Sequence, residues 1–232
     1  MPLPKVIVIA GSTGSGKSAI IRFINDHFYP AIDLETLANH RGSAFGQLHF
    51  YASQKDSQPS QEALSSDHSP TSSTSPNNTQ PSQQQFEAAV QQCWDKHLQA
   101  PLIFLEQEAP FIGKCKIPDW LCQQIATAFT IRIYIPKTIR IQHILDTYGN
   151  IPVPLLSAAL QQLEKRVSPQ QMMLLNELLQ AGEAEAFVEN LLSYYDHSLH
   201  YLPGYAHELY FDHGDIPEIA TAIVEYVRRA FL

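Results

Sequence analysis

A glycine-rich segment near the N-terminus has the composition and spacing of a phosphate-binding loop. Its eight residues, GSTGSGKS, satisfy the pattern G-x-x-x-x-G-K-S directly after a predicted strand and directly before a predicted helix. Glycines let the backbone amides point inward at a phosphate chain, and the helix N-terminus favours the same negative charge. The residues expected to bind phosphate are Gly11, Ser12, Thr13, Gly14, Ser15, Gly16, Lys17 and Ser18. We expect Lys17 to reach the outer phosphate oxygens and the Ser18 hydroxyl to ligate Mg²⁺.

Acidic residues stand at the end of a second apolar strand, in the segment LIFLEQE. Glu106 and Glu108 are alternate residues, so their side chains point the same way if the strand continues. Sites of this kind usually have an acidic residue there, which holds the metal or its water. We expect Glu106 to ligate Mg²⁺ together with Ser18, and the alternative is a solvated strand end.

A third polar segment follows a short strand that ends near residue 32. It contains Asp33, Glu35, His40 and Arg41, which we expect on a loop at the carboxyl edge of the sheet. Ligands bind at that edge in doubly wound sheets. Arg41 is suited to clamp a phosphate through two hydrogen bonds, and Asp33 or His40 to exchange protons. Taken without other information, these residues fit ordinary loop polarity equally well.

Short apolar runs alternate with helical patterns along the chain and predict the elements that carry these residues. The expected strands are Lys5–Ala10, Leu102–Glu106, Thr130–Ile135 and Glu208–Phe211. The expected helices are Lys17–His27, Phe86–Leu98, Ile139–Tyr148, Pro154–Arg166, Pro169–Gln180, Ala184–Tyr195 and Pro217–Phe231. This order predicts an α/β fold, a P-loop NTPase-like three-layer sandwich with a mostly parallel sheet and a helical C-terminal part. For Arg140, on the helix after the third long strand, a surface salt bridge is favoured over a role as a lid arginine.

The segment from Ser53 to Gln85 differs in composition from the rest of the chain. Among its 33 residues only Ala63 and Leu64 are apolar, and Ser, Gln and Pro dominate. Such a segment cannot bury enough apolar surface to fold by itself. We therefore expect residues 1–232 to form a single P-loop domain with a disordered insertion at 53–85.

Composition limits the class of protein. With 232 residues, 44% hydrophobic and 16% charged, the chain is long enough for one buried core. It contains no apolar run of about 18 residues and no signal-peptide pattern, so a cytoplasmic location without membrane contact is expected. Three cysteines without C-x-x-C spacing fit a reducing compartment. The net charge of −8 comes from residues 177–232, so nucleic acid could dock only on the earlier part of the chain.

The segment DLETLANHRGSAFG at residues 33–46 resembles the DLExLAxHRGSxFG signature of the P-loop domain of bacterial tRNA 2-selenouridine synthase. Other segments follow that family in the same order along the chain. They are the glycine loop, a QPSQ string with Phe86-Glu87, Glu106-x-Glu108, Ile112-Gly113, Ile117-Pro118 with Leu121, and Leu191-Leu192 with Tyr194-Tyr195-Asp196. The resemblance covers most of the chain outside the Ser/Gln/Pro-rich segment.

The resemblance implies a function in tRNA wobble-uridine modification. Enzymes of that family convert 2-thiouridine to 2-selenouridine through an S-geranyl intermediate, with geranyl diphosphate and selenophosphate as donors. The loop is then expected to hold the diphosphate of geranyl diphosphate or phosphates of tRNA. Lys17, Arg41, the loop amides and Mg²⁺ are the groups that would stabilise a leaving diphosphate. The catalytic set is expected to be Lys17, Asp33, His40, Arg41 and Glu106.

Two departures from the family qualify this expectation. The family has Ser-Arg where this chain has Ala109-Pro110, so one phosphate or tRNA contact is expected to be lost. The strand before the phosphate loop begins at Lys5, so the catalytic-cysteine rhodanese domain of the family is expected on a separate partner protein. The alternatives are a kinase or ATPase that uses ATP or GTP, and a nucleotide-binding module without turnover. Neither the tRNA nor the oligomeric state follows from the sequence.

Overall fold

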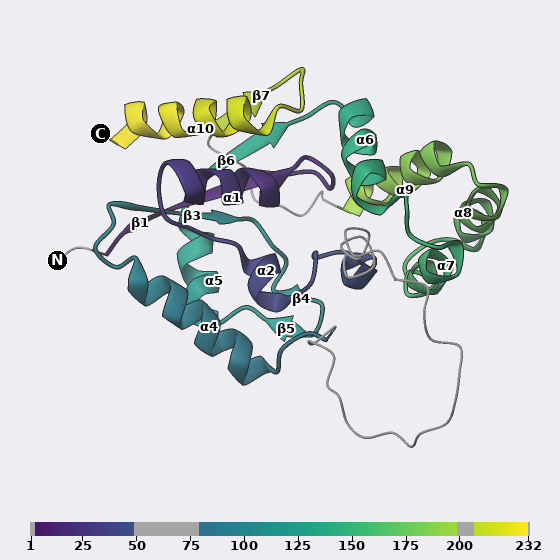
Figure 1. Ribbon diagram of the computed structural model, residues 1–232, viewed down its shortest axis with the longest axis horizontal. Coiled ribbons are helices and arrows are strands. Elements are labelled where there is room, and N and C mark those ends of the chain that lie inside the picture. The colour runs from purple at the N-terminus through teal and green to yellow at the C-terminus, as the bar shows by residue number, and fades with distance from the viewer. Residues whose placement is uncertain (1–2, 49–78, 199–206, 232) are drawn as a thin grey trace, which may run out of the picture.

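The computed structural model describes residues 3–48, 79–198 and 207–231 (Figure 1). Within these residues, the main sheet has the order β2-β3-β1-β6-β7, and each neighbouring pair is parallel. Its strands are β1 (Lys5–Gly11), β2 (Ala31–Ile32), β3 (Leu102–Glu106), β6 (Phe129–Tyr134) and β7 (His207–Tyr210). The predicted α/β class with a parallel sheet is thus confirmed. Because parallel strands share one direction, the ends of β1, β2 and β3 meet at one edge of the sheet.

Helices cover both faces of the sheet and form two separate cores. One face packs against α1 (Lys17–His27) and α10 (Ile216–Phe231), and Ile7 and Ile9 of β1 point into this core. The other face packs against α4 (Gln83–Lys96) and α5 (Asp119–Ala126), and Val6 and Val8 point there. Successive strand residues face opposite sides, so an unbroken apolar run suits a strand that is buried on both faces.

The helical C-terminal part has a core of its own beside the sheet. It consists of α6 (Lys137–Tyr148), α7 (Val153–Gln161), α8 (Pro169–Ala181) and α9 (Ala184–Ser198), and it lies beyond one end of the sheet in Figure 1. Leu160, Leu175 and Leu192 are buried at its centre. Ser168 caps α8 by accepting a hydrogen bond from the Gln171 amide. Helix α7 ends at residue 161, five residues earlier than predicted.

Several short elements were not predicted from the sequence. They are α2 (Leu34–Ala38), the 3-10 turn η1 (Gly46–Leu48) and an antiparallel pair formed by β4 (Phe111–Ile112) and β5 (Cys115–Lys116). Elements of two to five residues are too short to show a hydrophobic period. The three cysteines form no disulfide bond with one another.

The predicted insertion at 53–85 lies mostly outside the described residues. Its last residues, 79–85, are described, and they correct the expected boundary. The Gln80 side chain is buried and donates to the carbonyl oxygens of Ala38 and Ile112. Ser82 and Gln85 then form a reciprocal capping box at the start of α4. Residues 79–85 therefore belong to the folded structure, because buried hydrogen bonds and a helix cap hold these polar residues.

No helix in the described part of the chain combines the length and the apolar character that a membrane span requires.

Candidate functional site

The predicted phosphate loop joins the end of β1 to the start of α1. Gly14 and Gly16 have φ angles of 80° and 82°, in the left-handed region that favours glycine. A β-carbon on Gly14 would lie 2.9 Å from the Ile144 side chain and 3.0 Å from the Arg140 carbonyl oxygen. Gly16 is the N-cap residue of α1, and no side chain caps this helix. The amides of its first turn are therefore left for a ligand or water.

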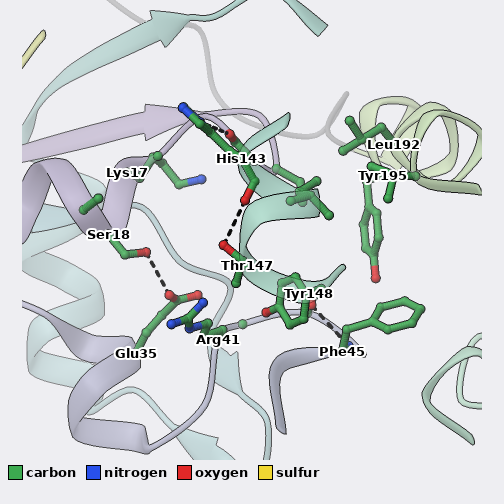
Figure 2. A pocket seen from close by; sticks show the side chains of 18 of the residues that line it. Lys17, Ser18, Glu35, Arg41, Phe45, His143, Thr147, Tyr148, Leu192 and Tyr195 are labelled. Carbon is green, nitrogen blue, oxygen red and sulfur yellow. Dashed lines mark hydrogen bonds between the residues drawn. The ribbon is translucent and has the colours of Figure 1, made fainter. Parts of the chain in front are cut away.

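Lys17 and Ser18 begin helix α1 next to two carboxyl groups. The Lys17 ammonium group donates to the Gly11 carbonyl oxygen at 3.0 Å. The Ser18 Oγ atom lies 2.8 Å from Glu35 Oε2, as Figure 2 shows, and 2.9 Å from Glu106 Oε2. A hydroxyl group has one proton to donate. Ser18 can therefore satisfy only one of these two carboxylates as a donor.

Glu35, Glu106 and Glu108 form an acidic cluster around Ser18. Burial raises the pKa of Glu106 well above its usual value, and the nearby Glu35 and Glu108 raise it further. Burial and repulsion by Glu35 raise the pKa of Glu108 to about 7. The pKa of Glu35 is also raised, because burial outweighs the Ser18 hydrogen bond and the attraction of Lys17. The ligand-free cluster therefore holds protons at a pH where ordinary glutamates are ionised.

Helix α2 positions Glu35, and it replaces the loop that was predicted for this segment. Asp33 is the N-cap residue: its Oδ1 atom accepts from the Thr36 amide at 2.8 Å, and its Oδ2 atom pairs with Arg22 at 2.9 Å. The helix ends at Asn39, which has a φ of 51°. Asp33 thus begins a helix and pairs with a cation, while Glu35 in the first turn reaches Ser18.

His40 and Arg41 follow α2 and have different surroundings. His40 is only 6% exposed, and a β-carbon on Gly46 would lie 2.5 Å from its ring. The imidazole ring therefore packs closely against the turn of the glycine. Arg41 hydrogen-bonds the hydroxyl group of Tyr148, whose pKa burial raises to about 12. In Figure 2, Arg41 lies between Glu35 and Tyr148. Arg41 thus links the acidic cluster to helix α6.

A cavity of about 1060 Å³ extends from the phosphate loop into the helical C-terminal part. Figure 2 shows Lys17, Ser18 and Glu35 on one side, with Leu192 and Tyr195 on the other. We call these two regions the phosphate end and the apolar end. The apolar end is lined by leucine and aromatic side chains, among them Phe45, Leu156, Phe187, Leu191, Leu192 and Tyr195. One cavity thus combines anion-binding groups with a hydrocarbon-like surface.

The structure brings most of the predicted site residues to this cavity. Those that line it are Gly11, Thr13, Gly14, Gly16, Lys17, Ser18, His40, Arg41 and Glu106. Three other predicted site residues, Ser12, Ser15 and Asp33, do not line this cavity in the described structure. Ser15 is buried, with 1% of its surface exposed. Asp33 caps the N-terminus of α2 and pairs with Arg22 instead.

Helix α6 contacts the predicted phosphate loop, and its residues from His143 to Tyr148 line the cavity. Arg140 Nη1 donates to the Thr13 carbonyl oxygen at 3.1 Å, and the Arg140 guanidinium group donates to both carboxylate oxygens of Asp196 at 2.9 and 2.7 Å. His143 Nδ1 lies 3.0 Å from the Gly14 carbonyl oxygen. The salt bridge favoured for Arg140 is present, but its location on the surface is wrong, because the residue is 6% exposed. Helix α9, which carries Asp196, packs against α6 next to the Arg140 side chain.

The apolar end was not predicted from the sequence. The resemblance included Leu191, Leu192 and Tyr195, but it assigned them no contact with the phosphate loop. Helical periodicity identifies α9 as amphipathic and does not show which of its apolar residues line a cavity. Part of the apolar face of α9 borders the cavity and does not pack against a neighbouring helix. This follows only from the arrangement of α7, α8 and α9 in the folded protein.

The oxygen atoms around Ser18 suit Mg²⁺. Glu106 is fully buried, and its Oε1 atom has no hydrogen-bond partner within the described structure. Mg²⁺ is usually held by one or two carboxylates together with phosphate oxygens and water. No set of three or more His, Cys, Asp or Glu residues in the described ranges is arranged to hold a metal ion. Ser18 and Glu106 therefore fit a cation whose remaining ligands come from a phosphate and water.

Comparison with known proteins agrees with the sequence motifs. The family model of the tRNA 2-selenouridine synthase AAA domain matches residues 4–69 and 66–152. The tRNA 2-selenouridine synthase of Nitrosomonas europaea is 30% identical over 148 residues, which are 62% of this chain and 31% of that protein. The enzyme of the same name from Aeromonas salmonicida is 27% identical over 197 residues, which are 77% of this chain and 44% of that protein.

The chain thus spans about a third to less than half of the length of these relatives. The matched residues contain the phosphate loop, helix α2, Arg41 and Glu106, and so most of the phosphate end of the cavity. The chain belongs to the family of the tRNA 2-selenouridine synthase AAA domain.

Proposed function

We propose that this chain binds a prenyl diphosphate, with geranyl diphosphate as the expected ligand, and transfers its prenyl group to 2-thiouridine in tRNA. The observation that carries the proposal is the cavity, in which a phosphate loop continues into a leucine- and aromatic-lined compartment. The name of the family supplies the tRNA substrate class.

The apolar end favours a prenyl diphosphate over a nucleotide. Each CH₂ group that leaves water contributes about 0.8 kcal/mol, so a ten-carbon chain gains substantially from contact with Phe187 and Leu192. The hydroxyl groups of a ribose gain no such energy from leucine side chains, and they lose hydrogen bonds to water there. Both ligands would place their phosphates at Lys17, so the difference lies at the apolar end.

The phosphate end is suited to stabilise a leaving diphosphate. In the proposed transfer, the bond between the first prenyl carbon and the diphosphate oxygen breaks, a carbon–sulfur bond forms, and the proton lost by the thiouracil ring passes to water. Lys17, Arg41 and the amides at the N-terminus of α1 would meet the negative charge that develops on the diphosphate. Ser18 and Glu106 would hold Mg²⁺, which supplies further positive charge to the diphosphate.

Binding measurements test the ligand class directly. We expect isothermal titration calorimetry to show geranyl diphosphate binding at least about a hundredfold more tightly than inorganic pyrophosphate, because of the buried chain. ATP and GTP should bind no more tightly than pyrophosphate. Tighter binding of ATP or GTP than of geranyl diphosphate, with hydrolysis that depends on Lys17, would favour the kinase or ATPase alternative.

Transfer to tRNA is tested by mass spectrometry of nucleosides. We expect the purified chain to geranylate tRNA that contains 2-thiouridine, and the Arg41→Ala variant to transfer less while keeping its thermal midpoint. Arg22→Ala is a matched control, since Arg22 also lies at the cavity but pairs with Asp33. Equal transfer by the parent and Arg41→Ala would remove Arg41 from the proposed mechanism.

A further inference from the structure

We infer that Glu35 is a ligand of the divalent cation at Ser18, so that the cation site comprises Ser18, Glu106 and Glu35. The inference rests on the proposed function in one respect only, that a diphosphate supplies further ligands to the cation. The protein's own part of the site is tested without a prenyl ligand.

The first support is the way in which two carboxylates approach one hydroxyl group. Glu35 Oε2 and Glu106 Oε2 lie 2.8 and 2.9 Å from the same Ser18 Oγ atom. They come from different elements, since Glu35 is on α2 and Glu106 ends β3. Two carboxylate oxygens and a hydroxyl oxygen so close together match the hard oxygen ligands that Mg²⁺ takes from a protein.

A second, independent support is the unsatisfied oxygen of Glu106. This side chain is fully buried and lines the cavity, and its Oε1 atom has no hydrogen-bond partner within the described structure. A buried carboxylate oxygen without a partner is costly. A cation bound between Glu106 and Glu35 would provide the missing interaction and leave Ser18 Oγ as a third ligand.

The balance of negative and positive side chains around the cluster also favours a bound cation. Glu35, Glu106 and Glu108 all line the cavity, and the positive side chains that face them are Lys17 and Arg41. Asp33 is nearby and pairs with Arg22. A diphosphate bound at the phosphate loop would add more negative charge to the same space. A divalent cation is the usual means by which proteins place carboxylates next to phosphates.

Glu35, rather than Glu108, completes the site because of its contact with Ser18. Within the described structure, the Ser18 hydroxyl contacts Glu35 and Glu106 and no other carboxylate. Both carboxylates border Gly42, where a β-carbon would lie 2.8 Å from Glu35 Oε1 and 3.1 Å from Glu108 Oε2. Glu108 thus borders the cluster without sharing the hydroxyl group.

Mn²⁺ serves as the probe, because its unpaired electrons allow bound and free ion to be measured by electron paramagnetic resonance. The full chain is titrated with Mn²⁺, with and without inorganic pyrophosphate, and Mg²⁺ is added as competitor. We expect one Mn²⁺ per chain, displaced by Mg²⁺. Glu35→Gln and Glu106→Gln should each weaken binding at least tenfold, whereas Glu185→Gln, on the surface of α9, should bind as the parent does.

Circular dichroism and the thermal midpoint identify a variant that fails to fold, and Glu35→Asp then serves as the second test. This variant keeps the carboxylate on a shorter side chain, so it should bind Mn²⁺ more tightly than Glu35→Gln. The inference is overturned if Glu35→Gln binds Mn²⁺ like the parent, or if the parent binds none with pyrophosphate present. Mn²⁺ binding without geranyl diphosphate binding would contradict the proposed function and leave this site intact.

Discussion

The two ends of the cavity are built in different ways. At the phosphate end, the loop glycines, Lys17 and Ser18 lie within eight consecutive residues, and Glu106 ends the strand next to β1. At the apolar end, Leu156 and Leu192 come from separate helices of the C-terminal part. Backbone conformation of a short segment determines the first end, whereas packing of distant helices determines the second.

This difference separates the expected source of affinity from the expected source of selectivity. In the proposed function, backbone amides and a lysine suit any polyphosphate, so the phosphate end would provide affinity with little selectivity. The apolar end would contact the part of the ligand that differs between a nucleotide and a prenyl diphosphate. The contact between Arg140 on α6 and Asp196 on α9 joins the two ends, since Arg140 also holds the Thr13 carbonyl oxygen.

The largest effect is expected where the two ends are joined. Asp196→Ala should lower the free energy of unfolding by about 3 kcal/mol, because it leaves the buried Arg140 guanidinium group without its carboxylate. Urea denaturation measures this loss. On the same helix, Glu189→Ala removes an exposed pair with Lys137 and should change stability by less than about 1 kcal/mol. Similar losses in both variants would show that the Arg140 pair does not hold the two ends together.

The next effect concerns the phosphate end. Lys17→Ala should weaken binding of pyrophosphate and of geranyl diphosphate equally, by about ten- to a hundredfold, because a charge-assisted hydrogen bond contributes about 1.5 to 3 kcal/mol. Calorimetric titration measures both ligands. Lys96→Ala, at the end of α4 and away from the cavity lining, is the control. If every polyphosphate still bound Lys17→Ala as tightly as the parent, the loop would not be a phosphate site.

A pH dependence of stability is expected from the acidic cluster. The pKa of Glu108 is raised to about 7 in the folded protein, so the folded state binds more protons than the unfolded state between about pH 4.5 and 7. The free energy of unfolding should therefore fall as the pH rises through this range. Urea denaturation of the ligand-free protein at several pH values measures the slope.

Glu108→Gln should reduce this slope, because glutamine does not titrate. Glu177→Gln, on the exposed face of α8, should keep the slope of the parent protein. A slope that is the same in all three proteins would mean that Glu108 titrates in the folded protein as it does in the unfolded chain.

The smallest effect is expected at the apolar end. Leu156→Ala removes part of the cavity lining and should weaken binding of geranyl diphosphate by about 1 kcal/mol, or roughly fivefold. Binding of inorganic pyrophosphate should not change. Competition between the two ligands in one titration measures the difference. An equal loss for both ligands would indicate that the two ends do not act separately.

The sequence located the glycine-rich loop between β1 and α1 because its information is local, and phosphate binding there stays a prediction. Glycines at positions 11, 14 and 16 favour the turn between β1 and α1, and an acidic residue at the end of β3 lies beside it in a parallel sheet. The long strands and helices were also found from their hydrophobic period. Runs of apolar residues identify the strands buried on both faces, and apolar residues three or four positions apart identify the helices that cover them.

Helix α2 shows where local reasoning fails. The polar residues from Asp33 to Arg41 were expected on a loop, yet Asp33 caps a five-residue helix that is buried by Leu34 and Ala38. So short a helix has no period to detect, and packing against α4 stabilises it. Its formation turns Glu35 toward Ser18 and leaves Asp33 to pair with Arg22.

By itself, therefore, the sequence determined the α/β class, the position of the glycine-rich loop and the family resemblance, because each depends on neighbouring residues or on a repeated pattern. The tertiary structure decided three further features: the acidic cluster around Ser18, the burial of Arg140 with Asp196, and the apolar end of the cavity. In the first two, the residues that meet are separated by 17 and 88 positions around Ser18 and by 56 positions between Arg140 and Asp196. Such contacts depend on how helices pack, and no local preference of the chain encodes them.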